Sequence, residues 1–283
     1  MPAFDHETAA LNSPKSSWWD DEFTRLLLEV VPADARQIVE IGCGNARSAH
    51  SLLPSLPDAE YIGISAKEHL VKEAEAGLAK FPYHRRAKIR LGKVNALRLD
   101  DESADVTLSL MTLQHSRHVE EAVAEVHRVL RVGGRFVTIE PDNLGQRFYF
   151  NGGLEVINDV YHKLCLRARV ARQPADIAIG PRISQLMQGA GFTGIRVAVH
   201  AIHSSRTEDA KSFFARLRKI CRSTAENAGL AEDTDEIAAC EEAINRCLYA
   251  GMPQRIGFST HLVPVFRCVA EKPRLSGEHS AVR

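Results

Sequence analysis

The stretch IVEIGCGNARSAH, residues 38–50, places a β-branched apolar run directly before two glycines that one residue separates. A short run of this kind is typical of a strand buried in a parallel sheet, and the glycines let the backbone come close to a ligand. The helix expected from residue 45 would add free backbone N–H groups, which attract negative charge. The stretch therefore predicts the first strand, ligand loop and helix of an α/β fold.

Strands and helices alternate after this stretch. Helices of about a dozen residues separate most of the apolar runs, which indicates β-α-β units and a parallel sheet with both faces covered. We expect a doubly wound, mostly parallel seven-stranded sheet. Its strands are expected at residues 36–44, 60–65, 87–95, 103–112, 133–141, 194–203 and 261–272.

The bulk composition excludes several classes of protein. The chain has 283 residues, 45% of them hydrophobic, and a formal net charge of zero, so it has no overall attraction to nucleic acid or membranes. Its six cysteines form no CxxC pair and no Cys/His cluster at metal-ligand spacing, so we expect reduced thiols and no metal. No secretory leader opens the sequence, and no apolar run approaches the ~20 residues of a membrane span. These features predict a cytoplasmic protein.

The glycine pattern argues against a dinucleotide-binding fold. That fingerprint requires a third glycine at position 47, where this sequence has Arg47. A loop with no ligand, in which the glycines only make a turn, remains an alternative at this point.

Four motifs in order resemble the class I S-adenosylmethionine-dependent methyltransferases, and specifically their type 11 group. They are VEIGCGNA, YIGIS, VNALRLDDESADVTLSLMTLQH and AEVHRVLRVGGRFVTIEPDN, and they cover about residues 36–142. The resemblance implies a Rossmann-like methyltransferase fold with helical lid insertions, and S-adenosylmethionine as the cofactor, with S-adenosylhomocysteine as its product.

The resemblance also implies roles for individual residues. Glu40 would accept from the methionine amino group, the loop of Gly42, Cys43 and Gly44 would pass the methionyl part, and Asn95 with Ala96 would meet the adenine. The remaining cofactor positions are the ribose-side Ser65, the adenine-facing Leu70 and Leu97, and Leu110 with Met111 beside the sulfonium.

Two positions depart from the family pattern. Ala46 replaces a third glycine of the loop, which is tolerable where φ is negative. Ser65 replaces the acid that holds both ribose hydroxyls, and the loss of charge-assisted hydrogen bonds would weaken cofactor binding by about 1–3 kcal/mol.

The predicted organisation divides the chain into six segments. They are an N-terminal helical arm (1–35), a cofactor-binding core (36–142), a helical insertion plus the sixth strand (143–206), a helical lid insertion (207–260), the last strand (261–272) and a tail (273–283).

The acceptor side is less specific. His115 is the candidate general base, although it could equally shape the cofactor pocket, and Glu140 could be a structural carboxylate. The expected substrate pocket comprises Trp18, Trp19, Glu140, Phe148 and Tyr149, although such aromatics often only pack.

A small-molecule acceptor, reached through a lid, is the favoured function. Residues 163–222 hold twelve Lys or Arg, which could attract an anionic acceptor, bind RNA or simply form a solvated helix surface. The open alternatives are an RNA methyltransferase that uses this basic face, and a degenerate fold that only binds a ligand or partner. A homodimer is compatible with the sequence, and no membrane partner is expected.

Overall fold

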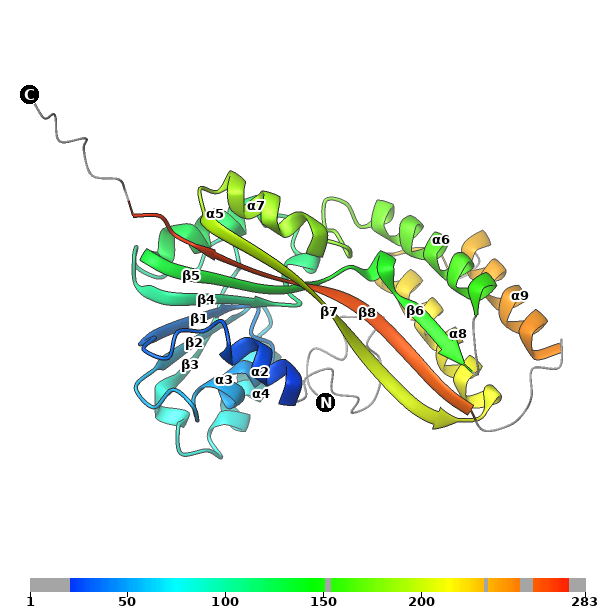
Figure 1. Cartoon of the computed structure of the whole chain (residues 1–283), viewed down its shortest axis with the longest axis horizontal. Coiled ribbons are helices and arrows are strands. Elements are labelled where there is room, and N and C mark those ends of the chain that lie inside the picture. Colours follow the sequence, from blue (N-terminus) through cyan, green and yellow to red (C-terminus); the bar gives the residue numbers. More distant parts are fainter. Residues whose placement is uncertain (1–20, 151–153, 232–233, 250–256, 275–283) are drawn as a thin grey trace, which may run out of the picture.

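The computed structural model describes residues 21–150, 154–231, 234–249 and 257–274. Their strands form one eight-stranded sheet in the order β3-β2-β1-β4-β5-β8-β6, with β7 paired to β8 (Figure 1). The bounds are β1 Gln37–Ile41, β2 Glu60–Ser65, β3 Ala87–Leu91, β4 Ala104–Leu110, β5 Leu130–Pro141, β6 Arg147–Phe150, β7 Thr193–Glu208 and β8 Gly257–Glu271. The first five strands are parallel and β8 is antiparallel to its neighbours, so the predicted doubly wound, mostly parallel sheet is confirmed.

Helices cover both faces of the parallel part of the sheet (Figure 1). On one face lie α2 (Asp21–Leu28), α3 (Arg47–Leu52) and α4 (Glu68–Leu78), and on the other α5 (Val119–Val129) and α7 (Ile183–Gly189). Short 3-10 turns connect the elements at η1 (His84–Arg86), η2 (Leu113–His115), η3 (Asn143–Gly145) and η4 (Gly180–Arg182).

The central strands are apolar because both of their faces are covered. In β1 only the first residue is partly exposed, and Ile38 and Ile41 are fully buried against opposite layers of helices. The carboxyl ends of the five parallel strands meet at one edge of the sheet, which is where open α/β sheets bind ligands.

A second lobe extends from this core (Figure 1). It consists of α6 (Glu155–Ala171), α8 (Ala210–Asn227) and α9 (Asp235–Tyr249), packed on β6 and on the distal halves of β7 and β8. Its core is aromatic: the rings of Phe150 and Phe213 stack with centroids 5.0 Å apart, and Phe148 stacks on His261 at 4.4 Å.

The long strands differ from the sequence-based expectation. The structure extends β7 to Glu208 and begins β8 at Gly257, so β7 runs two residues and β8 four residues into the segment expected to be a helical lid. A further short strand, β6, lies in the segment 143–206, where a helical insertion and only one strand were expected. The helical lobe therefore sits on a β-ribbon that is continuous with the main sheet. None of the described helices is long and apolar enough to cross a membrane.

Candidate functional site

The loop after β1 has an alternating left-handed backbone. Gly42, Gly44 and Ala46 have φ values of 69°, 53° and 58°. A Cβ at Gly42 would lie 2.2 Å from Thr112 Cγ2, so only glycine fits there. At Ala46 the negative φ on which tolerance of the methyl group depended is absent, because the loop needs a left-handed residue just before α3. Ala46 therefore carries steric strain of about 1–2 kcal/mol.

Glu40, which lies on β1 two residues before Gly42, supports this loop. Its side chain is buried, and Oε2 accepts hydrogen bonds from Tyr61 Oη at 2.5 Å and from Ser48 Oγ. Burial raises the pKa of Glu40 to about 7, against the opposing effect of these two hydrogen bonds. Sequence reasoning missed both partners, although a tyrosine inside a buried strand requires a hydrogen-bond partner and so gave a signal.

The side chain of Cys43 does not face the loop's open side. It is fully buried in the core, where a Cβ on Gly63 would lie 2.7 Å from its sulfur. Burial, with Glu40 nearby, raises the pKa of the Cys43 thiol well above its usual value. Only its backbone belongs to the candidate site, and its N–H donates to Ile64 O at 3.0 Å, which ties the loop to β2.

The ends of β2 and β3 bring the predicted ribose and adenine residues to the same edge. Ser65 is buried, and its hydroxyl accepts from Lys67 N at 3.4 Å, just before α4. Leu70 and Leu97, which follow these strand ends in the sequence, are buried, whereas Ala96 is exposed.

Two glutamates of α5 fix the turn after β3. Asn95 Nδ2 donates to Glu121 Oε2 at 2.7 Å, and Leu97 N donates to Glu125 Oε1 at 2.9 Å. The amide oxygen of Asn95 is therefore the atom of this side chain that could accept a hydrogen bond from a ligand. The sequence gave no sign of these two contacts, which join residues 26 and 28 positions apart.

Glu140, near the end of β5, holds in place the chain that follows β4. Its Oε1 accepts from Ser109 Oγ at 2.8 Å, Thr112 N at 3.0 Å and Leu113 N at 2.9 Å. Burial raises the pKa of Glu140 to about 7, and among the described residues Oε2 has no hydrogen-bond partner. The fully buried Glu140 thus supports the loop that carries Met111 and does not face solvent. This agrees with the structural role named above as one of its two possible roles.

The sulfonium-side residues are both inaccessible to solvent. Leu110 is fully buried, and Met111 is buried with a left-handed backbone, φ 55°. A left-handed conformation at a long side chain is costly and persists because Glu140 and Thr112 constrain the loop on both sides.

His115 lies in η2 and meets the end of α6. Arg172 Nη2 donates to His115 Nδ1 at 3.1 Å. A guanidinium only donates, so Nδ1 accepts and the ring proton lies on Nε2, a buried atom without a partner in the described chain. Burial, followed by the charges of Arg172 and Lys67, lowers the pKa of His115 to about 3. This geometry makes His115 a hydrogen-bond donor and does not suit the expected base role.

The structure does not bring the predicted aromatic pocket together. Phe148 and Tyr149 lie on opposite faces of β6, so Phe148 is buried in the lobe core whereas Tyr149 is 43% exposed. Trp18 and Trp19 lie outside the described residues.

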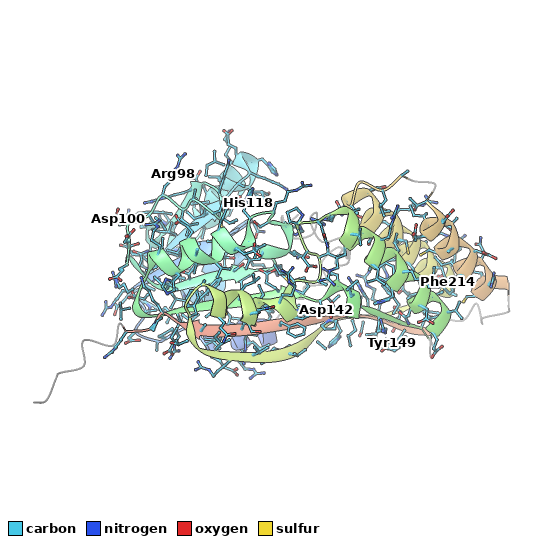
Figure 2. All side chains as sticks on the ribbon, turned by 90° about the horizontal axis from the view of Figure 1, so that it is seen from above. Arg98, Asp100, His118, Asp142, Tyr149 and Phe214 are labelled. Atoms are coloured by element: carbon cyan, nitrogen blue, oxygen red, sulfur yellow. The ribbon has the colours of Figure 1, made fainter. Side chains whose placement is uncertain are left out.

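A buried chain of polar side chains links the two lobes, and sequence reasoning missed it. Gln114 Nε2 donates to Met111 O at 3.2 Å, Asn143 Nδ2 donates to Gln114 Oε1 at 3.0 Å, and Gln146 Nε2 donates to Asn143 Oδ1 at 2.8 Å. Gln146 Oε1 then pairs with His261 Nε2 at 2.9 Å. Asp142, which caps η3, marks this junction between core and lobe in Figure 2.

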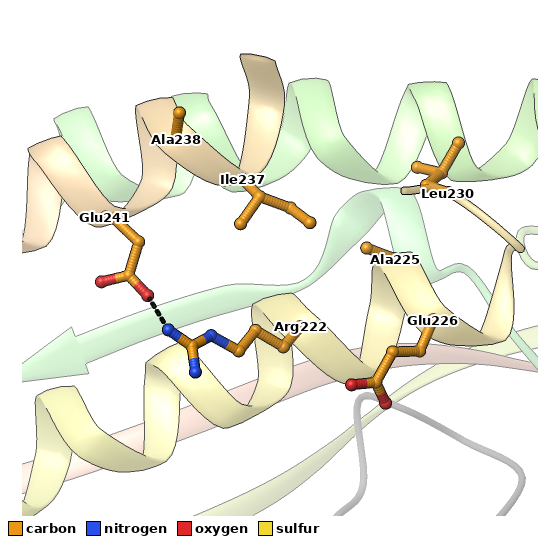
Figure 3. Close-up of a pocket in the computed structure, with 7 residues that line it drawn as sticks. All are labelled: Arg222, Ala225, Glu226, Leu230, Ile237, Ala238 and Glu241. Carbon is orange, nitrogen blue, oxygen red and sulfur yellow. Dashed lines mark hydrogen bonds and ion pairs between the residues drawn. The ribbon is translucent and has the colours of Figure 1, made fainter. Parts of the chain in front are cut away.

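Part of the basic run at 163–222 is paired with three carboxylates of the described residues. Five of its twelve cations form ion pairs: Arg169 and Arg182 with Asp176, Arg216 with Glu208, and Arg218 and Arg222 with Glu241. The pair of Arg222 and Glu241 borders a cavity of about 380 Å³ between α8 and α9 (Figure 3). The described residues that line it all belong to the lobe.

Comparison with known proteins defines the core. Residues 39–138 match the family model described as a methyltransferase domain. Together with the fold and the loop geometry, the match defines this part of the chain as a class I S-adenosylmethionine-dependent methyltransferase domain of the type 11 group.

Individual relatives cover only part of this chain. The phthiotriol/phenolphthiotriol dimycocerosates methyltransferase of Mycobacterium tuberculosis is 31% identical over 117 residues, 40% of this chain and 41% of that protein. The chain spans about 30–52% of the length of the curated relatives that match first.

Two solved structures share the fold at low identity. Phosphoethanolamine N-methyltransferase 2 of Haemonchus contortus, in complex with phosphomonomethylethanolamine and S-adenosylhomocysteine, is 13% identical with a TM-score of 0.53 over 90% of this chain and 53% of that chain. The [4+2]-cyclase SpnF is 17% identical with a TM-score of 0.52 over 92% and 86%.

Proposed function

We propose that this chain transfers a methyl group from S-adenosylmethionine to a small-molecule acceptor bound at the carboxyl edge of the sheet. The observation that carries the proposal is the left-handed loop of Gly42, Gly44 and Ala46 above the buried carboxyl of Glu40, in a domain that matches methyltransferases. The acceptor would carry oxygen, nitrogen or an activated carbon as its nucleophile.

The residues at the strand ends fit the cofactor. Asn45 Oδ1, in the glycine loop, is buried without a partner in the described chain and suits a donor such as the methionine ammonium group. Asn95 would accept from the adenine amino group, and Ser65 would bind the ribose with one hydroxyl where a carboxylate would bind two. When bound, S-adenosylmethionine would supply an electrophilic methyl group on its sulfonium.

The chain's part in the reaction is positioning. An in-line displacement depends on the alignment of the acceptor with the methyl group, which holding both molecules in one geometry supplies. Glu140 and Thr112 hold the loop of Met111 in place, and His115 Nε2 is a buried donor without a partner in the described chain. We infer that His115 donates a hydrogen bond that orients the methyl acceptor. We also infer that the acceptor does not lose a proton to His115.

The ion pairs of the lobe support a small-molecule acceptor over RNA. A surface that follows a phosphate backbone needs cations with free charge, whereas five of those expected here have carboxylate partners. The helical lobe beside the strand ends would then shape the acceptor side of the site.

Two measurements test the proposal. Calorimetry on the full chain should show S-adenosylhomocysteine binding that Gly44→Val abolishes, because a β-branched residue cannot adopt the left-handed loop. Incubation with methyl-labelled S-adenosylmethionine and a metabolite extract should place label in the low-mass fraction. Label in ribonuclease-sensitive material would favour the RNA alternative, and binding without any transfer would favour a binding module.

A further inference from the structure

Residues 172–182 form a wall beside the end of β5. A Cβ on Gly180 would lie 2.7 Å from Glu140 O, so this segment lies directly against the strand end. Asn143 Nδ2 donates to Ile177 O, which joins the segment to η3. The wall therefore borders the side of the candidate site where the acceptor would bind.

Three arginines lie in or beside this wall, and two of them share the carboxylate of Asp176. Arg169 Nε lies 2.9 Å from Asp176 Oδ1, and Arg182 Nη1 lies 3.1 Å from Asp176 Oδ2. Asp176 is buried, so these two ion pairs hold the segment in place.

Arg172, the third arginine, is oriented differently. Its Nη2 donates to His115 Nδ1, and in the described ranges no carboxylate lies within ion-pairing distance of it. A partly buried guanidinium with only a neutral imidazole as partner has unused donors and an uncompensated charge.

Other positive groups converge on the same place. Burial, and then the charge of Arg117, lower the pKa of Arg172, and the charge of Lys67 makes the smallest of three contributions to the lowered pKa of His115. The buried Nε2–H of His115 adds a neutral donor without a partner in the described part of the chain. Unused donors on Arg172 and His115, with no carboxylate of the described residues paired to Arg172, are the features of an anion-binding site.

We propose that Arg172 and His115 form a subsite for the anionic group, a phosphate or a carboxylate, of the methyl acceptor. His115 follows the end of β4 by a few residues, so the anion would be held next to the place of methyl transfer. Arg172 supplies charge and a fork of donors, and His115 supplies one N–H. This inference rests on the proposed function, because it takes the β4–β5 side of the site to be the acceptor's.

The test uses the full chain with inorganic phosphate and, separately, acetate as probes, titrated by calorimetry at constant ionic strength with S-adenosylhomocysteine bound. One or both anions should bind, and the tighter one identifies the acceptor's group as phosphate or carboxylate. Arg172→Gln should weaken that binding about tenfold or more, while its S-adenosylhomocysteine affinity stays within about twofold.

The matched control is Arg167→Gln, which removes an exposed charge from the same helix and should leave anion binding unchanged. Equal weakening by both variants, or no binding of either anion, overturns the subsite. Should Arg172→Gln fail to fold, Arg172→Lys replaces it and should weaken phosphate binding several-fold, because an ammonium cannot donate two parallel hydrogen bonds.

A further arm separates the acceptor's anion from the carboxylate of the cofactor. Phosphate should bind equally well with S-adenosylhomocysteine or with 5′-methylthioadenosine, which lacks the amino-acid carboxylate. Phosphate binding only with 5′-methylthioadenosine would assign the subsite to the cofactor and overturn the inference. Failure of S-adenosylhomocysteine itself to bind would instead count against the proposed function.

Discussion

The hydroxyl of Thr112 donates a hydrogen bond to the carbonyl oxygen of Gly42 at 3.2 Å and so joins the loop after β1 to the loop after β4. These two loops would carry the cofactor's methionyl part and the methyl group, respectively. Their relative position therefore depends on a contact between residues that are 70 positions apart in the sequence.

Because of this contact, Gly42→Ala should lower the free energy of unfolding by more than the left-handed backbone of residue 42 alone would cause. The methyl group would collide with Thr112, whereas Gly229 has the same φ of 69° and open space around it. We expect Gly229→Ala to lower the free energy of unfolding by about 1–2 kcal/mol, and Gly42→Ala by at least ~1–3 kcal/mol more. Urea unfolding of both variants measures the difference, and equal losses would show that the loop can move away from Thr112.

Glu140 predicts a particular dependence of stability on pH. Its pKa is raised to about 7 in the folded protein, against 4.5 as its ordinary value, so the folded state binds more protons between these two values. Its contribution to stability is therefore complete below about 4.5 and is lost as pH rises through about 7. Relative to the natural chain, Glu140→Gln should become more stable across that interval, by at most on the order of 3 kcal/mol.

Urea unfolding at several pH values measures this trend for Glu140→Gln. The control is Glu75→Gln on the exposed surface of α4, which should show no such trend. A difference between Glu140→Gln and the natural chain that stays constant from pH 4.5 to 7 would mean that Glu140 ionises normally.

Ser65→Asp should strengthen cofactor binding. The new carboxylate would still accept from Lys67 N and could also accept from both ribose hydroxyls, so we expect S-adenosylhomocysteine to bind about tenfold more tightly. Ser65→Asn provides the uncharged control of the same shape and should show a smaller gain. Calorimetry gives both affinities, and weaker binding by the aspartate variant would show that the ribose is held elsewhere.

Asn143→Ala should destabilise the junction of the two lobes. It would leave two buried atoms, Gln114 Oε1 and Gln146 Nε2, without the partner that Asn143 supplies, which should lower the free energy of unfolding by about 2–4 kcal/mol. Asn227→Ala, an exposed counterpart, should cost less than about 0.5 kcal/mol. Similar small losses in both variants would mean that water replaces the buried chain of amides.

The parallel core was predictable because its signals are local. Each strand is a short apolar run, each helix has its own period, and the glycine loop is contiguous in sequence. The lengths of β7 and β8 were not predictable in the same way. The SSRTE end of β7 is an edge strand with few buried residues and so has no hydrophobic pattern that would distinguish it from a loop.

The site residues divide along the same line. Ser65 and Asn95 could be placed at the strand ends from the order of the elements, Glu40 was assigned from the resemblance to methyltransferase motifs, and their roles toward the cofactor stay predictions. The partners that set their chemistry come from distant elements, such as Tyr61 for Glu40 and Arg172 for His115. The role expected of His115 depended on its free nitrogen, which only the tertiary contact with Arg172 decides.

The register of the long ribbon has a consequence for how this protein can vary. Glu208, the last residue of β7, pairs with Gly257, the first of β8, so the chain leaves the sheet and returns to it at facing positions. Helices α8 and α9 are therefore an insert in the turn of a hairpin. Such an insert can lengthen, shorten or change its surface during evolution without shifting the register of any strand that carries the loop of Gly42 and Gly44.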